Sequence, residues 1–153
     1  MENEQDFFGD KVRSAAFPVK GHTVKGQVLK APSVMQQRDF VSKEPKFYKD
    51  GNPMKQWVFL LQTDERIEDD DEDTIYDEDD GRRGLYAKGQ MEKAIRAAAS
   101  KAGLKKSSDF IGAHITVTWA SQKPSQSGGS PQKIYEAVVE RGELAGADGA
   151  AFE

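Results

Sequence analysis

The sequence predicts a mainly β domain with five short strands and one helix between the third and the fourth. Several short apolar or alternating stretches are each bounded by turn residues, which is typical of strands. One stretch, Gln90–Ala102, instead repeats its apolar residues with the period of a helix. The chain has 153 residues, of which 37% are hydrophobic, and this is enough for one domain with a core but not for two.

The first two strands differ in character. His22–Leu29 is the first expected strand, in which Val24 and Val28 share a face and Gly26 interrupts the run. A glycine inside a strand often marks a bulge or a sharp bend. Gln56–Thr63 is the strongest strand signal in the chain, because it is apolar, β-branched and aromatic and follows a turn-forming segment. Both faces of this second strand are apolar, so the sequence leaves open which face is inward.

The remaining elements follow in order along the chain. Arg82–Gly89 is the third expected strand, and Gln90–Ala102 follows it directly as an amphipathic helix that Gly103 is well placed to end. Ile111–Ala120 and Lys133–Glu140 are the fourth and fifth strands, joined by a Ser, Gly and Pro-rich hairpin loop.

Five strands with a helix after the third is the order of the OB-fold, a small, partly open Greek-key barrel. Propensity alone is equally compatible with another small α+β barrel or an open sheet, but the helix position and the interrupted first strand favour the OB-fold. The expected organisation is an N-terminal arm over 1–19, the OB-fold domain over 20–142 and a flexible tail over 143–153. Phe7, Phe8 and Phe17 of the arm are expected to pack onto the domain.

The charges of the chain are unevenly divided. The segment Glu68–Asp80 holds 10 of the 26 Asp and Glu residues and no basic residue. Without it, 16 acids stand against 22 Lys and Arg, so the formal charge moves from −4 to +6. The sequence therefore predicts a basic domain suited to a polyanion, with a disordered acidic loop between its second and third strands.

The acidic segment has two further interpretations. It could lie across the basic groove and compete with a nucleic-acid strand. It could also be a calcium loop, since Asp69, Asp71 and Asp73 have the opening spacing of one. However, Thr74 stands where such a loop requires glycine, and Asp80 stands where it has glutamate. No metal site is therefore predicted.

The sequence contains few of the residues and motifs from which catalytic sites are built. There is no Cys, and His22 and His114 are the only histidines, without a phosphate-loop glycine pattern or a His-Glu metal spacing. Acids clustered in a polar loop lack the unequal environments that separate a general acid from a base. We expect a protein that is not an enzyme and needs no cofactor. The acidic start and the lack of an apolar run of about 18 residues predict a cytoplasmic location without a membrane partner.

Two stretches resemble a known family. The run Gly51–Asp64, and Asp80–Gly89 followed at once by a helix, are similar to single-stranded DNA-binding proteins of the OB-fold class from bacteriophages. The resemblance implies sequence-independent binding of single-stranded DNA during phage replication, recombination or repair in the host cytoplasm, with replication or recombination proteins as further partners. Cellular members of the wider class end in an acidic run closed by Pro-Phe, whereas this chain ends Ala151-Phe152-Glu153. Whether the chain forms a homo-oligomer stays open.

A binding site of this kind needs cations for the phosphates and flat rings on which bases stack. The second and third strands and the long connection before the second strand offer both. The residues predicted to contact DNA are Arg38, Lys43, Lys46, Phe47, Tyr48, Lys55, Trp57, Phe59, Arg82, Arg83, Tyr86 and Lys88. Trp57 and Phe59 could equally be core residues. The alternative function is a protein-interaction module whose acidic loop mimics DNA toward a basic partner.

Overall fold

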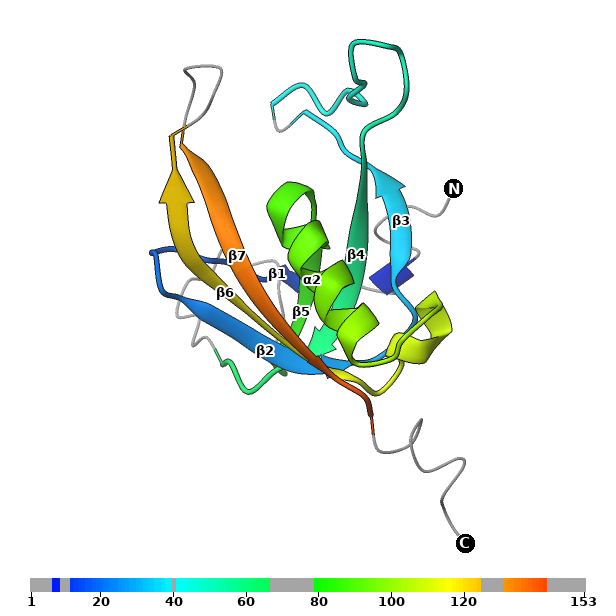
Figure 1. Cartoon of the computed structure of the whole chain (residues 1–153), viewed down its shortest axis with the longest axis vertical. Helices are drawn as coiled ribbons and strands as arrows, with labels where there is room; N and C mark the ends of the chain where they lie inside the picture. Colours follow the sequence, from blue (N-terminus) through cyan, green and yellow to red (C-terminus); the bar gives the residue numbers. More distant parts are fainter. Residues whose placement is uncertain (1–6, 9–11, 40, 67–78, 125–130, 143–153) are drawn as a thin grey trace, which may run out of the picture.

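The protein is a curled, open sheet with a helix in its hollow. The computed structural model describes residues 7–8, 12–39, 41–66, 79–124 and 131–142. Figure 1 shows the sheet curving around helix α2 (Gly89–Lys101), so that the two together form a half-barrel. Among these described residues, no helix is long and apolar enough to cross a bilayer.

The sheet has seven strands in the order β1-β5-β4-β2-β6-β7, and β3 also pairs with β4. All pairings are antiparallel except that of β1 with β5. The strands are β1 Arg13–Ser14, β2 Thr23–Val28, β3 Ser33–Gln36, β4 Lys55–Gln62, β5 Arg82–Ala87, β6 His114–Lys123 and β7 Gln132–Glu140. A 3-10 turn, η1 (Ser107–Phe110), lies between α2 and β6. Within the described residues the outer strands β1 and β7 do not pair with each other, so the sheet stays open.

The mainly β class and the order of elements agree with the prediction. The five expected strands correspond to β2, β4, β5, β6 and β7, and the expected helix corresponds to α2. The sequence missed β1 and β3, which have two and four residues and are too short to show a period. β2 and β3 both pair with β4, with Val28 opposite Leu61 and Ser33 opposite Val58. They therefore form one interrupted strand along β4. Counted separately, the sheet has seven strands where five were expected.

Both faces of β4 are buried, so neither of them alone is the inward face. Phe59 and Leu61 enter the main core between the sheet and α2. Val58 and Leu60 enter a second cluster on the other face, which is completed by Met35 and the N-terminal residues Phe7 and Phe8. The expectation that these two arm residues pack onto the domain is confirmed, since their exposed fractions are 2% and 8%.

Two glycines permit the close approaches on which this packing depends. A Cβ atom on Gly26 of β2 would lie 2.7 Å from the backbone oxygen of Gln62 in β4. A Cβ atom on Gly84 of β5 would lie 2.6 Å from the ring of Phe8. Real Cβ contacts are longer than this, so the glycine that interrupts the first expected strand is explained by the closeness of β4.

Candidate nucleic-acid interface

The β3–β4 connection, residues 37–39 and 41–54, is held in shape by its own backbone. Gln37 N–H donates to the Met54 carbonyl at 2.7 Å, and Lys46 N–H donates to the Gln37 carbonyl at 2.9 Å. At the tip, Tyr48 N–H donates to the Asn52 carbonyl at 2.8 Å. The connection is therefore an ordered platform that positions its side chains.

The acids of this connection are used to hold its turns. The Asp39 carboxylate accepts hydrogen bonds from the backbone N–H groups of Val41 and Ser42, both at 2.9 Å. These bonds, with that of Ser42 first, lower the pKa of Asp39 below its ordinary value. The Asp50 carboxylate accepts from the backbone and the side-chain amide of Asn52, also at 2.9 Å. Short polar side chains that bond nearby backbone in this way stabilise turns.

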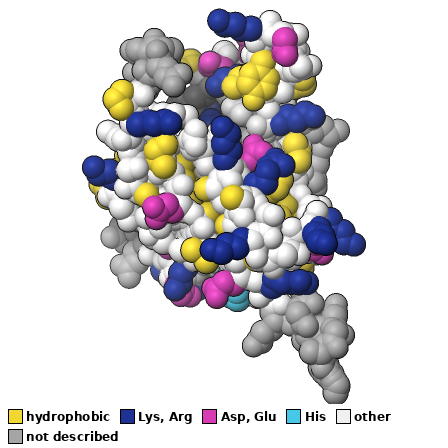
Figure 2. All heavy atoms as spheres, in the orientation of Figure 1, with side chains coloured by type: hydrophobic (Ala, Val, Ile, Leu, Met, Phe, Trp, Pro, Cys, Tyr) yellow, Lys and Arg dark blue, Asp and Glu magenta, His cyan; other side chains and the backbone are white. Residues whose placement is uncertain are grey.

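The connection exposes aromatic rings among cations. Phe47 and Tyr48 are adjacent in the chain and each 55% exposed, so both rings are accessible to a ligand. Lys46, Lys49 and Lys55 form no ion pair with any other residue in the described part of the chain. We call this the loop surface, made of Arg38, Lys43, Lys46, Phe47, Tyr48, Lys49 and Lys55. Figure 2 shows Lys and Arg side chains spread over this face of the molecule, with a hydrophobic side chain exposed near the top.

Trp57 and Phe59 follow the loop surface along β4, and their positions differ. Phe59 is 0% exposed and lies in the main core, so its prediction as a stacking residue was wrong. Trp57 is half-buried, with its ring 5.9 Å from Phe59 and 5.9 Å from Phe110 in edge-to-face contacts. The guanidinium carbon of Arg96, from α2, lies 4.7 Å from the centre of the Trp57 ring.

A pocket opens beside Trp57 between β3, α2 and η1. Its volume is about 270 Å³. Among its lining residues, an apolar side is formed by Val34, Trp57 and Phe110, and a cationic side by Arg96, Lys105 and Lys106, with no Asp or Glu from the described residues. We call it the Trp57 pocket.

The two lysines of this pocket stand on a fixed turn. Gly103, with φ +86°, ends α2 in the left-handed region, and Leu104 N–H donates to the Ala99 carbonyl at 2.9 Å. The Asp109 carboxylate then accepts from the backbone N–H groups of Lys105 and Lys106 at 2.9 and 3.1 Å. These bonds lower the pKa of Asp109. The predicted helix end at Gly103 is confirmed, and it positions both lysines.

The sequence missed Arg96, Lys105 and Lys106 as candidate site residues. The adjacent lysines directly after the helix end were visible, as was an arginine on the polar face of the helix. Nothing in the sequence showed that these residues share a pocket with Trp57, which lies 39 positions before Arg96 and 48 before Lys105.

Tyr86 and Trp57 lie on opposite faces of the sheet. In the register of β4 with β5, Tyr86 is opposite Val58 and Ala87 is opposite Trp57. Because successive residues of a strand point to opposite faces, Tyr86 shares a face with Val58. Its half-buried ring packs edge-on against Phe8, with 6.3 Å between centroids. The candidate rings of the second and third expected strands therefore do not share one face of the sheet.

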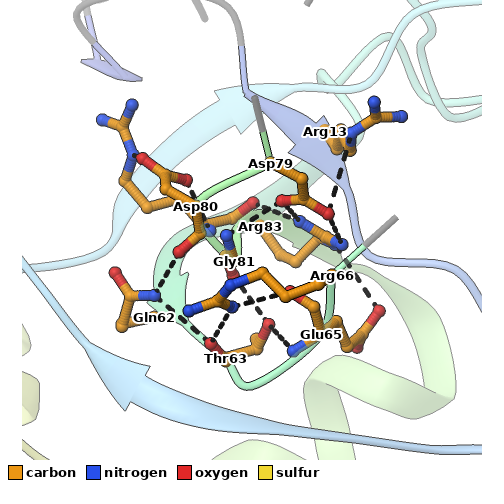
Figure 3. A network of polar contacts seen from close by, with 10 residues as sticks. Arg13, Gln62, Thr63, Glu65, Arg66, Asp79, Asp80, Gly81 and Arg83 are labelled. Carbon is orange, nitrogen blue, oxygen red and sulfur yellow. Dashed lines mark hydrogen bonds and ion pairs between the residues drawn. The ribbon is translucent and has the colours of Figure 1, made fainter. Parts of the chain in front are cut away.

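The basic residues of β5 also separate. Arg83 is 1% exposed, and its Nη1 and Nη2 donate to the two carboxylate oxygens of Asp79 at 2.9 and 2.8 Å (Figure 3). This bidentate pair raises the pKa of Arg83 above its ordinary value, and the prediction that Arg83 contacts DNA was wrong. Arg82 is partly exposed and pairs with Asp80 at 2.7 Å, while Lys88 is exposed just before α2.

Hydrogen bonds between residues at the end of β4 and residues just before β5 tie together the two ends of the β4–β5 connection. Thr63 N–H donates to the Gly81 carbonyl at 3.0 Å, and the Thr63 hydroxyl donates to the same carbonyl at 2.6 Å. The Gln62 side chain donates to the Asp80 carbonyl at 2.7 Å (Figure 3). Most of the acidic segment, residues 68–78, lies outside the described residues. The hypotheses that this segment is a calcium loop or a mimic of a nucleic-acid strand concern the same residues and therefore stay predictions. The tail over 143–153 lies outside the described residues as well.

Within the described residues, no group of three or more His, Asp or Glu residues could hold a metal ion. Comparison with known proteins finds no matching family model, no similar curated protein and no similar solved structure.

Proposed function

We propose that this protein binds single-stranded DNA without sequence specificity. The observation that carries the proposal is the loop surface, where Phe47 and Tyr48 are each 55% exposed beside lysines on a hydrogen-bonded platform. Exposed rings let bases stack, and each stacked base contributes about 1–3 kcal/mol to binding. The lysines supply the sequence-independent attraction to phosphates.

The charge of the described residues supports the same function. They contain 21 Lys and Arg against 11 Asp and Glu, a formal balance of +10. Several of these acids are occupied by backbone N–H groups or by arginines, including Asp39, Asp79 and Asp109. By count, the described residues are therefore positive although the whole chain has a formal charge of −4.

The assignment to the OB-fold class is part of this proposal. It is supported by β2 and β3, which together form one interrupted strand along β4, and by α2, which follows β5 and fills the hollow of the sheet. In this assignment the loop surface is the connection between the first and second strands of the barrel, which binds ligands in OB-folds. The resemblance to phage proteins then suggests a role in phage DNA replication, recombination or repair in the host cytoplasm.

The test is a titration of fluorescent oligo-dT at two salt concentrations. We expect binding that weakens as salt rises, and a loss of about 1–3 kcal/mol in Phe47→Ala and in Tyr48→Ala. Val41→Ala is the matched control, because Val41 is an apolar residue of the same connection that is 86% exposed and carries no ring. Competition with RNA and duplex DNA measures the preference for single-stranded DNA.

Two results would contradict the proposal. Absence of binding at low salt would favour the alternative of a protein-interaction module. Affinities of both ring variants equal to that of Val41→Ala would remove stacking on the loop surface.

A further inference from the structure

The Trp57 pocket begins where the loop surface ends. Lys55, the last residue of the loop surface, lies two residues before Trp57 on β4, so both side chains point to the same face. Their partners on β3 are Gln36 and Val34. The Gln36 side chain donates to the carbonyl of Lys46 at 3.0 Å, which fixes the connection to this end of the pocket. A ligand that leaves the loop surface along this face would reach the pocket next.

The pocket combines two kinds of wall. Val34 is 48% exposed although it is apolar, so one wall of the pocket is an uncovered hydrophobic surface beside the Trp57 ring. The cationic side carries Lys105 and Lys106, which form no ion pair with the other described residues, and Arg96, whose guanidinium covers the Trp57 ring. A ligand that fits both walls has a flat apolar body and an anionic group, which is the chemistry of a nucleotide.

Arg96 is held in place before any ligand arrives. Its guanidinium lies over the Trp57 ring at 4.7 Å and pairs with Glu92 one helical turn earlier. A planar guanidinium can stack on a base while its edge donates hydrogen bonds to a phosphate. A group that is fixed in this way loses less conformational entropy on binding.

We propose that the Trp57 pocket holds one nucleotide of the bound single strand. Its base packs against Val34 and against the Arg96 guanidinium that covers the Trp57 ring, and its phosphate lies beside Lys105 and Lys106. This inference rests on the proposed function and extends the binding site from the β3–β4 connection to α2 and η1.

A fluorescence titration tests the base contact. The chain has two Trp residues, so Trp119→Phe leaves Trp57 as the only indole. We expect oligo-dT to quench the Trp57 emission in this variant, with the same midpoint as binding measured through a fluorescent label. An emission that stays constant while the labelled oligonucleotide binds would overturn the base contact.

The double variant Lys105→Gln/Lys106→Gln tests the phosphate contact. We expect affinity at low salt to fall roughly tenfold and the slope of log affinity against log salt to become shallower by about 0.7, the value for one phosphate of a single strand. The control is Lys20→Gln/Lys25→Gln, which removes the same charge from exposed lysines outside both surfaces. Equal effects of the two double variants would overturn the phosphate contact.

Failure of this inference can be told apart from failure of the proposed function. If the wild-type protein does not bind oligo-dT, both fail. If it binds, and Phe47→Ala and Tyr48→Ala weaken binding while the Trp57 emission and the lysine variant show no specific effect, only the pocket fails. Unfolding midpoints of all variants, measured by urea titration, show whether each one is folded.

Discussion

The connections at the two ends of β4 carry opposite charges and are built in opposite ways. In the basic β3–β4 connection, the acids Asp39 and Asp50 bind backbone N–H groups of its turns. At the root of the acidic β4–β5 connection, Arg66 and Arg83 bind carbonyls and carboxylates. Each connection therefore uses side chains of its minority charge as internal hydrogen-bond partners. These side chains stay ionised, so they add structure to the connection without changing its net charge.

The two connections also differ in what they hold in place. The described part of the basic one has backbone hydrogen bonds from Gln37 to Met54, and these fix the backbone that carries Phe47 and Tyr48. Of the acidic one the structure describes the root, where Thr63, Gly81 and the buried Arg83–Asp79 pair fix the adjoining ends of β4 and β5. The first arrangement suits a binding surface, and the second suits the attachment of an insertion.

The largest effect is expected at the root of the acidic connection. Arg83→Met should lower the free energy of unfolding by about 3–5 kcal/mol, because it leaves the Asp79 carboxylate, only 4% exposed, without its bidentate partner. Arg82→Met is the control, since the Arg82–Asp80 pair is far more exposed and should contribute about 0–1 kcal/mol. Urea unfolding measures both. Similar losses in the two variants would contradict the structural importance of the buried pair.

The next largest effect is expected on DNA affinity when the acids of the β4–β5 connection are removed. Replacing residues 67–78 by a short Gly-Ser linker removes eight acids and leaves every root contact described above. We expect oligo-dT affinity to rise several-fold at low salt and to converge with wild type at high salt, because screening weakens the repulsion. The unfolding midpoint should not change.

Neutral substitution of the same eight acids, with the chain length kept, separates charge from length. An unchanged affinity at low salt in both variants would identify the segment as a passive insertion.

The smallest effect tests whether order or charge dominates in the basic connection. Asp50→Ala removes a negative charge, which by itself strengthens binding to a polyanion. It also frees the turn in which Tyr48 N–H bonds Asn52, so we expect binding to weaken by about 0.5–1.5 kcal/mol. Asp64→Ala makes the same charge change at an exposed acid of the other connection and should not weaken binding. Tighter binding by Asp50→Ala would show that charge outweighs order.

The elements that depend on neighbouring residues in the sequence were predictable. The apolar, β-branched run at β4 and the helical period of α2 each identify an element without reference to the rest of the chain. Gly103 ends the helix for a reason visible in the sequence, since glycine adopts positive φ without strain. The aromatic residues among the lysines of the β3–β4 connection were likewise predicted as a group, and they are exposed.

Whether an individual candidate site residue is buried or exposed depends on contacts between segments that are distant in the sequence. Phe59 and Val58 are adjacent and both fully buried, because α2 covers one face of β4 and the Phe7–Phe8 segment covers the other. Trp57 and Tyr86 are separated by the register of β4 with β5, which alternation within one strand cannot reveal.

The sequence by itself determined the local elements, their order, and the segregation of acids and bases into different connections, because each depends on neighbouring residues. Tertiary structure alone decided which rings and charges a ligand can reach. Arg83 is buried against Asp79, while Arg96, Lys105 and Lys106 meet Trp57 in one pocket. Accessibility depends on which surfaces the rest of the chain covers, and that is a property of the packed molecule.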